Sequence, residues 1–245
     1  MKKRAATKKA VSAKKGGLER IPTGIKGLDR YIEGGLIKGS TTLLTGATGT
    51  GKTIFCAQFI MEGLRRGEKC IFLTMEETVN DIFNDVNRFG WDLKKYADSG
   101  KLIIGYRDPF QLSELMDKLA EKIRREKIER VAIDSTSLFG LYYKDPFEVR
   151  KNLFNLLTKL KSTGATTILT SEMAEGDGTL SRFGVEEFVT DGVIVLRALG
   201  ISGSQYDKSM LVRKMRRTNH STDVHPFKIT GQGIEVMPAE KGLSI

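Results

Sequence analysis

The sequence lacks the cysteine content of a disulfide-rich or zinc-binding protein. Its 245 residues include two cysteines, Cys56 and Cys70, whose spacing matches no common metal site. Both lie among apolar neighbours, as is typical of cysteines buried in the core of proteins from a reducing compartment. We therefore expect a cytoplasmic protein with two small apolar core thiols.

Long hydrophobic runs are also missing. The apolar stretches are as short as GVIVL at 192–196, whereas a membrane-spanning helix needs about 20 residues. No apolar segment follows the basic N-terminus, so the sequence shows no secretory signal, and no internal repeat is visible. With 40% hydrophobic and 29% charged residues, the chain has an ordinary globular composition, and we expect no membrane partner.

Acidic residues are absent from positions 1–17, which hold seven of the ten excess positive charges of the chain. This segment offers little apolar surface to bury, so we expect a disordered basic arm ahead of one domain at 18–245. Such an arm favours nucleic acid or another polyanion as a partner. A solubilising tail with no partner is the alternative, because charge alone carries no specificity.

Apolar strands alternate with helical segments along most of the chain. Strands are expected at 41–46, 69–77, 101–108, 129–135, 165–172, 191–198 and 209–218. Helices are expected from Thr53 to about Arg66 and over 79–90, 111–127 and 147–162. This alternation predicts an α/β fold with a mostly parallel central sheet and helices on both faces. The last strands, including a hairpin at 227–230 and 234–237, have no helices between them, so that edge is expected to be antiparallel.

The stretch GATGTGKT at 46–53 matches the phosphate-binding pattern G-x-x-x-x-G-K-[ST] at every fixed position. A strand precedes it and a helix follows it, so loop amides and the helix N-terminus can hold phosphate. Lys52 would contact the β- and γ-phosphates and the Thr53 hydroxyl would bind Mg²⁺. The candidate nucleotide-binding residues are Gly46, Ala47, Thr48, Gly49, Thr50, Gly51, Lys52 and Thr53. A chance glycine turn is the alternative.

Two groups of acids follow apolar strands. Asp134 ends RVAID and is expected to hold Mg²⁺ through water, although an acid there could instead cap a helix. Glu76 and Glu77 end the strand CIFLTM, at the sheet edge where ligands bind in open parallel sheets. One of the two would orient the attacking water, and the other would open the next helix. We assign the catalytic role to Glu76.

Six stretches together resemble the KaiC-like ATPases of the RecA/RadA/DnaB superfamily. They are RIPTGIKGLDRYIEGGL, GATGTGKT, MEET, FGWDL, SRFGVEEFVTDGVIVL and KMRRTNH, and the resemblance covers about residues 18–237. It implies a RecA-type P-loop core that binds ATP and Mg²⁺ and hydrolyses ATP slowly. It also implies that copies form a ring, with a hexamer favoured, and that ATP lies between neighbouring subunits.

The resemblance assigns Lys214 and Arg216 to the γ-phosphate on a neighbouring subunit, and Thr218 and His220 to the same nucleotide. The alternation in LVRKMR independently predicts that Val212, Lys214 and Arg216 share one face, with Leu211, Arg213 and Met215 on the other. A cation pair supplied from a neighbour would stabilise charge on the transferred phosphoryl group. A basic edge strand that discourages aggregation is the alternative.

Two departures from the clock member of this family are visible. This chain has one ATPase domain where the clock protein has two, so nothing in it argues for an oscillator or for autophosphorylation. Arg217 stands where the clock protein has glycine, which makes the run 214–220 more basic.

The loops near 136–146 and 174–184 are candidate DNA contacts, because aromatic and basic residues are adjacent in them. Inward packing of the aromatics is the alternative, and acids in the second loop would repel phosphate. The chain is thus expected to be a ring ATPase. A RadA-paralogue-like module that binds ATP and DNA with little hydrolysis is the second hypothesis, and a phosphotransferase is a third for which no acceptor site is visible.

Overall fold

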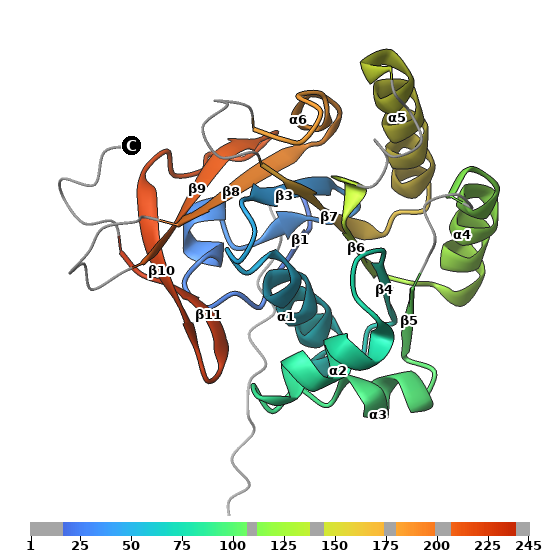
Figure 1. Cartoon of the computed structure of the whole chain (residues 1–245), viewed down its shortest axis with the longest axis horizontal. Helices are drawn as coiled ribbons and strands as arrows, with labels where there is room; N and C mark the ends of the chain where they lie inside the picture. Colours follow the sequence, from blue (N-terminus) through green and yellow to red (C-terminus); the bar gives the residue numbers. More distant parts are fainter. Residues whose placement is uncertain (1–16, 107–111, 138–144, 174–179, 199–206, 239–245) are drawn as a thin grey trace, which may run out of the picture.

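The computed structural model describes residues 17–106, 112–137, 145–173, 180–198 and 207–238. These residues build a nine-stranded sheet in the order β11-β10-β9-β8-β3-β7-β6-β4-β5 (Figure 1). Six neighbouring strands, β8, β3, β7, β6, β4 and β5, run parallel to one another. The pairs β8–β9, β9–β10 and β10–β11 are antiparallel. The predicted α/β architecture with an antiparallel C-terminal edge is confirmed.

The strands of the large sheet are β3 Thr41–Gly46, β4 Cys70–Thr74, β5 Leu102–Tyr106, β6 Arg130–Asp134, β7 Thr166–Glu172, β8 Gly192–Ala198, β9 Lys208–Met215, β10 Val224–Thr230 and β11 Gly233–Val236. The helices are α1 Lys52–Arg65, α2 Val79–Asn87, α3 Leu93–Asp98, α4 Leu112–Glu126, α5 Pro146–Ser162 and α6 Glu186–Val189. Each strand and helix expected from the sequence is found within a few residues of its expected position.

Alternating side chains on the strands divide the core between the two faces of the sheet. On β4, Phe72 packs with α1 and α2, whereas its neighbours Ile71 and Leu73 pack with α4 and α5. Figure 1 shows α1, α2 and α3 gathered on one side of the sheet and α4 and α5 on the other. This layering leaves the carboxyl ends of the parallel strands available for a site.

The lead-in before β3 is structured, as expected, and includes elements too short to show a period. Strands β1 Arg20–Ile21 and β2 Leu36–Ile37 pair antiparallel, and a 3-10 turn, η1, covers Asp29–Ile32. Helix α3 was not anticipated, although the Asp92 side chain caps it by accepting a hydrogen bond from Lys95 N at 2.9 Å. The four-residue helix α6 was not anticipated either.

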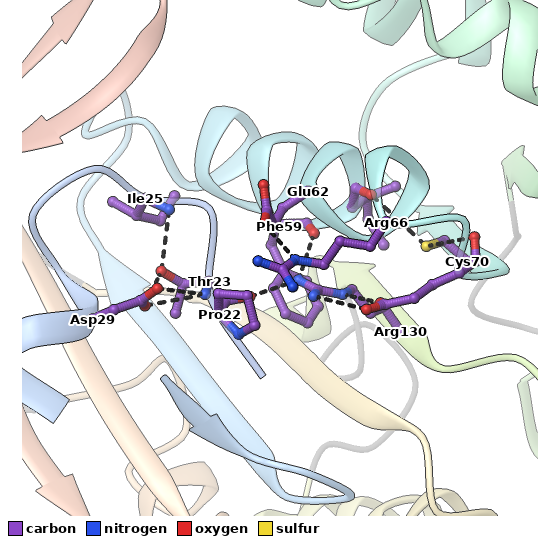
Figure 2. Close-up of polar contacts among 11 residues, drawn as sticks. Pro22, Thr23, Ile25, Asp29, Phe59, Glu62, Arg66, Cys70 and Arg130 are labelled. Atoms are coloured by element: carbon purple, nitrogen blue, oxygen red, sulfur yellow. Dashed lines mark hydrogen bonds and ion pairs between the residues drawn. The ribbon is translucent and has the colours of Figure 1, made fainter. Parts of the chain in front are cut away.

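A buried arginine ties the lead-in to the sheet. Arg130, fully buried at the start of β6, pairs with Glu68 and donates hydrogen bonds to Pro22 O at 2.9 Å and Phe59 O at 3.0 Å. Figure 2 shows its guanidinium between the lead-in and helix α1, with the Phe59 ring 4.7 Å away. Thr23 next to Pro22 is bonded in turn to Asp29. These contacts fix the lead-in against α1.

The predicted face assignment on β9 is wrong. Val193 of β8 pairs with Lys214 and Ile194 pairs with Val212, so Arg213 is the extra residue of a β-bulge. The bulge shifts the alternation, and Met215 joins Val212 in the core cluster that includes α1. Lys214 instead shares the face of Val193, which packs with Leu43 on the opposite side of the sheet.

Candidate nucleotide-binding site

The loop between β3 and α1 has the backbone that the phosphate-binding pattern requires. Gly49 and Gly51 adopt φ of 76° and 100°, which is the left-handed region that glycine tolerates best. Gly46 lies so close to β8 that a Cβ would be 2.5 Å from Leu196 O. Gly51 caps α1 without a side-chain hydrogen bond, so first-turn amides of this 14-residue helix remain available to an anion.

Lys52 is buried and belongs to the loop itself. Its Nζ donates to Gly46 O at 3.0 Å and to Ala47 O at 3.1 Å, and Thr50 Oγ1 donates to Ala47 O at 2.8 Å. These contacts hold the ammonium group at the mouth of the loop, where a triphosphate would meet it. Thr53 lies one residue further along α1 and is half-buried.

Carboxylates surround this loop at the carboxyl edge of the sheet. Asp134 ends β6 and its Oδ1 accepts a hydrogen bond from Thr170 Oγ1 of β7. Glu76, two residues after β4, accepts a hydrogen bond from Ser135 Oγ. Glu172 ends β7 beside Gly46, and its Oε1 accepts a hydrogen bond from Thr48 Oγ1 of the loop at 3.1 Å. The fold thus brings the acids predicted from separate strands to one edge.

The electrostatics distinguish Glu76 from Glu77. Burial and then the charges of Asp134 and Glu172 raise the pKa of Glu76, although the Ser135 hydrogen bond and Lys52 oppose the shift. Burial also raises the pKa of Glu77, but apart from Asp134 its charged neighbours are Glu76 and the α2 acids. Lys52 is among the main charges that act on Glu76, whereas the main charges that act on Glu77 are all acids.

If Glu76 orients the attacking water, as the sequence predicts, the pH dependence of turnover should follow its raised pKa. A base with a raised pKa loses its charge as the pH falls through that higher value, so kcat/KM should fall in acid above the ordinary glutamate pKa of about 4.3. Glu172→Gln removes a like charge and should move this acidic limb to lower pH. The measurement is kcat/KM against pH, with Glu121→Gln on the exposed side of α4 as control. An unchanged limb in Glu172→Gln would contradict the assignment of Glu76.

The hydroxyl and carboxylate oxygens near the loop suit Mg²⁺ better than a metal ion whose ligands all come from protein side chains. Among the described residues, no three His, Cys, Asp or Glu side chains gather into a metal cluster. Mg²⁺ beside a nucleotide takes most of its ligands from phosphate and water, so few protein ligands are needed. The Thr53 hydroxyl and the Asp134 carboxylate are donors of the right kind, and Asp134 lies beside Thr170 at the same edge as the loop.

Lys214 and Arg216 are not part of this cluster. The backbone N–H of Arg216 donates to Asp191 O, and Asp191 N–H donates to Thr41 O at the start of β3. The loop begins five residues later at Gly46, which is about 16 Å further along the strand. Lys214 Nζ donates to Glu187 O at 2.9 Å and to Thr190 O at 2.8 Å at the end of α6. The structure therefore places this cation pair, Lys214 and Arg216, near the amino ends of β3 and β8, whereas the loop follows the carboxyl end of β3.

Thr218 and His220 lie beyond the cation pair, in the turn before β10. Thr218 Oγ1 accepts a hydrogen bond from Arg20 Nη1 at 3.1 Å, and His220 Nδ1 lies 2.9 Å from Ser221 O. Arg217 adopts a left-handed φ of 57°, a conformation that glycine adopts more readily. All four predicted residues of the run 214–220 are thus close together but apart from the loop of their own subunit.

An exposed aromatic surface adjoins Arg216. Phe147 and Phe154 of α5 and Phe188 of α6 are each more than half exposed. With Arg150 and Arg216 they line a pocket of about 400 Å³. Three exposed phenylalanines beside two arginines suit a protein contact better than a water-facing surface.

The sequence analysis did not identify four polar residues that contact the nucleotide loop, its acids or the cation pair. Glu172 was placed on a strand but given no role, and Ser135, Thr170 and Asp191 were not singled out. Glu172 had the same signal as Glu76, because it is an acid at the end of an apolar strand. Ser135 and Thr170 become visible only when neighbouring strands are in register.

A parallel sheet with a phosphate-binding loop after β3 and an acid at the end of β6 defines a P-loop NTPase of the RecA type. A family model described as "ATPase: KaiC" matches residues 21–241. The chain belongs to the KaiC-like ATPase family, whose members share this nucleotide-binding fold.

Individual relatives agree with this assignment. The circadian clock oscillator protein KaiC of Parathermosynechococcus lividus is 38% identical over 233 residues, covering 91% of this chain and 43% of that protein. KaiC of Synechococcus elongatus is also 38% identical, covering 90% of this chain and 44% of the relative. The chain thus spans less than half the length of these curated relatives.

A solved structure matches over its whole length. The crystal structure of the KaiC-like protein PH0186 from Pyrococcus horikoshii OT3 is 40% identical with a TM-score of 0.82, covering 91% of this chain and 100% of that one. This similarity supports the RecA-type fold directly. In the described part of the chain, no helix is long and apolar enough to cross a membrane.

Proposed function

We propose that this chain hydrolyses ATP with Mg²⁺ at the seams between its copies, where a seam is the contact of one copy with the next. The loop at 46–53 holds the triphosphate, Thr53 and Asp134 hold Mg²⁺, and Glu76 orients water. The neighbouring copy supplies the cation pair Lys214 and Arg216 from the end of its β9. Nucleotide state is thereby coupled to the arrangement of subunits, and turnover is expected to be slow.

The distance between the cation pair and the loop supports this proposal most directly. In one copy the two regions lie at opposite ends of the strands β3 and β8, so a single copy cannot bring them to one phosphate. A head-to-tail contact places the cation pair of one copy against the loop of the next and repeats around a ring, for which a hexamer is favoured. The exposed phenylalanines beside Arg216 give that contact an apolar component.

Charge complementarity supports the same contact. Arg150, Lys151 and Arg216 lie around the aromatic pocket, whereas Glu76 and Glu77 lie on the side of the nucleotide loop. The α2 acids Asp81 and Asp85 add to that negative side. Opposite potentials on two faces of one chain favour an association in which unlike faces meet.

Mixing two inactive variants tests whether copies complete one another. Lys214→Ala keeps its own loop and Glu76 but donates no complete cation pair, whereas Glu76→Gln keeps its pair but cannot activate water. In an equal mixture, about a quarter of seams combine a working loop with a working pair, so up to that share of wild-type turnover should return. ATP turnover is measured across mixing ratios, after unfolding and refolding together if subunits exchange slowly. Absence of rescue at every ratio would contradict completion by a neighbour.

The second candidate function is a module that binds ATP and DNA with little hydrolysis. The seven basic residues of the arm favour it, since clustered Lys and Arg bind phosphate backbones with strong salt dependence. Residues 1–16 of the arm and the loop segments 138–144 and 174–179 lie outside the described residues. DNA contact through the arm and loops, and disorder of the arm, therefore stay predictions.

A further inference from the structure

Asp191 is a buried acid that links the start of β3 to the cation pair. It lies immediately before β8 and is 7% exposed. Its Oδ2 accepts hydrogen bonds from Thr41 N at 3.0 Å and from Thr41 Oγ1 at 3.1 Å. Thr41 is the first residue of β3, the strand that ends in the nucleotide loop.

The other side of Asp191 faces Arg216. The backbone N–H of Arg216 donates to Asp191 O at 2.9 Å, and Arg216 Nη1 lies 3.6 Å from Asp191 Oδ1. Lys161 of α5 pairs with the same Oδ1 at 2.9 Å. Lys214 is held next to this group, because its Nζ donates to the carbonyl of Thr190, the residue before Asp191.

These contacts hold the backbone of Arg216 and one side of its guanidinium, which also donates from Nη2 to Phe188 O at 3.5 Å. The Arg216 side chain is half exposed, so its guanidinium can meet a partner molecule while the backbone stays bonded to Asp191. Burial opposes the charge of Asp191, but the Lys161 and Thr41 hydrogen bonds outweigh it and lower the pKa of this carboxyl. Asp191 therefore stays an anion at neutral pH and attracts both Lys214 and Arg216.

We infer that Asp191 is a positioning residue, which sets the direction in which Arg216 reaches the nucleotide bound by the neighbouring copy. This inference rests on the proposed function, because it assigns Asp191 to the subunit that donates the cation pair. The carboxylate orients the guanidinium without contacting nucleotide. Through Thr41 it also joins the cation pair to β3, so the pair is anchored to the strand that carries its own subunit's loop.

A purely structural role makes a different prediction about which subunit is impaired. If Asp191 only secured the start of β3, its loss would disturb the loop of the same copy, and the subunit that holds ATP would fail. If Asp191 positions Arg216, its loss impairs the subunit that donates the pair. Mixed assemblies of the two inactive variants separate these explanations. In every working seam, the Lys214→Ala subunit holds ATP and the Glu76→Gln subunit donates the cation pair.

The experiment adds Asp191→Asn to one inactive variant at a time. When Asp191→Asn is added to the Glu76→Gln variant, the change lies in the subunit that donates the cation pair to each working seam. When it is added to the Lys214→Ala variant, the change lies in the subunit that holds ATP. Turnover restored by mixing should fall roughly tenfold or more in the first mixture, because a small misplacement of a reacting group is costly. It should stay within about twofold of the unmodified mixture in the second. KM should change little in either mixture, since the loop that binds ATP is intact.

Thr41→Val removes one hydroxyl hydrogen bond to Asp191 from the β3 side and should leave the restored turnover within about twofold in either inactive variant. Equal losses in both mixtures, or a loss only in the ATP-holding subunit, would overturn the positioning role, as would full rescue in both. A failure of the unmodified mixture would instead contradict the proposed function, and the positioning role with it.

Discussion

Replacing Lys52 with alanine is expected to lower ATP turnover by about a thousandfold or more, because a preorganised charge at the transferred phosphoryl group is a large part of such catalysis. Lys52 also holds the loop, since its Nζ bonds the carbonyls of Gly46 and Ala47. Both losses act on the same step. Steady-state phosphate release measures turnover, and equilibrium nucleotide binding shows how much of the loss comes from affinity.

Lys94→Ala is the matched control for this change. Lys94 lies exposed on α3 and pairs with Asp98 one turn away, so its loss removes the same charge far from phosphate. Turnover should remain within about twofold of the wild type, because exposed ion pairs contribute little. If Lys52→Ala retained a tenth or more of wild-type turnover, the assignment of the loop as the site of hydrolysis would be wrong.

Replacing Arg130 with alanine is expected to lower the free energy of unfolding by about 3–5 kcal/mol. The change leaves Glu68 without its buried partner and removes the hydrogen bonds that Arg130 donates to the carbonyls of Pro22 and Phe59. It also opens space beside Gly63, whose position allows the arginine stem to pass close to α1. Denaturant unfolding at a fixed protein concentration without nucleotide measures the effect, because ligand and assembly both shift apparent stability.

Arg66→Ala gives the comparison, since both arginines lie in the region drawn in Figure 2. The Arg66 side chain is 50% exposed and pairs with Glu62 one turn away, whereas the Arg130 side chain is 0% exposed. Loss of the surface pair should cost about 1 kcal/mol or less. Arg130→Met keeps most of the stem volume, so its loss should still exceed that of Arg66→Ala. Equal effects of Arg130→Ala and Arg66→Ala would show that the buried pair does not anchor the lead-in.

The elements that could be predicted are those whose signal is local. The helix after GATGTGKT and the strand before it follow from glycine spacing and a run of apolar residues. The strands at 129–135 and 165–172 follow from β-branched runs bounded by turns. Helix α6 and the β1–β2 pair could not be found in this way, because elements of two to four residues are too short for a period to appear.

The error on β9 has a different origin. Strict alternation assigned Lys214 to the face of Val212, and the bulge at Arg213 moves it to the other face. A bulge depends on the neighbouring strand, since it exists only where two residues oppose one. No pattern within LVRKMR therefore reveals it. The shift brings Lys214 to the end of α6 beside Asp191 and Arg216, where we propose that the cation pair acts.

The sequence alone determined the phosphate-binding loop, the order of strands and helices along the chain, and the acids that follow the strands. Each of these features depends only on residues that are adjacent in the sequence. Only the tertiary structure decided which distant residues meet. It joined Glu172 to Thr48 and Asp191 to both Thr41 and Arg216, and it put the cation pair far from the loop of its own chain. These relations depend on strand order and register, which arise from packing across the whole sheet and are set by no single segment.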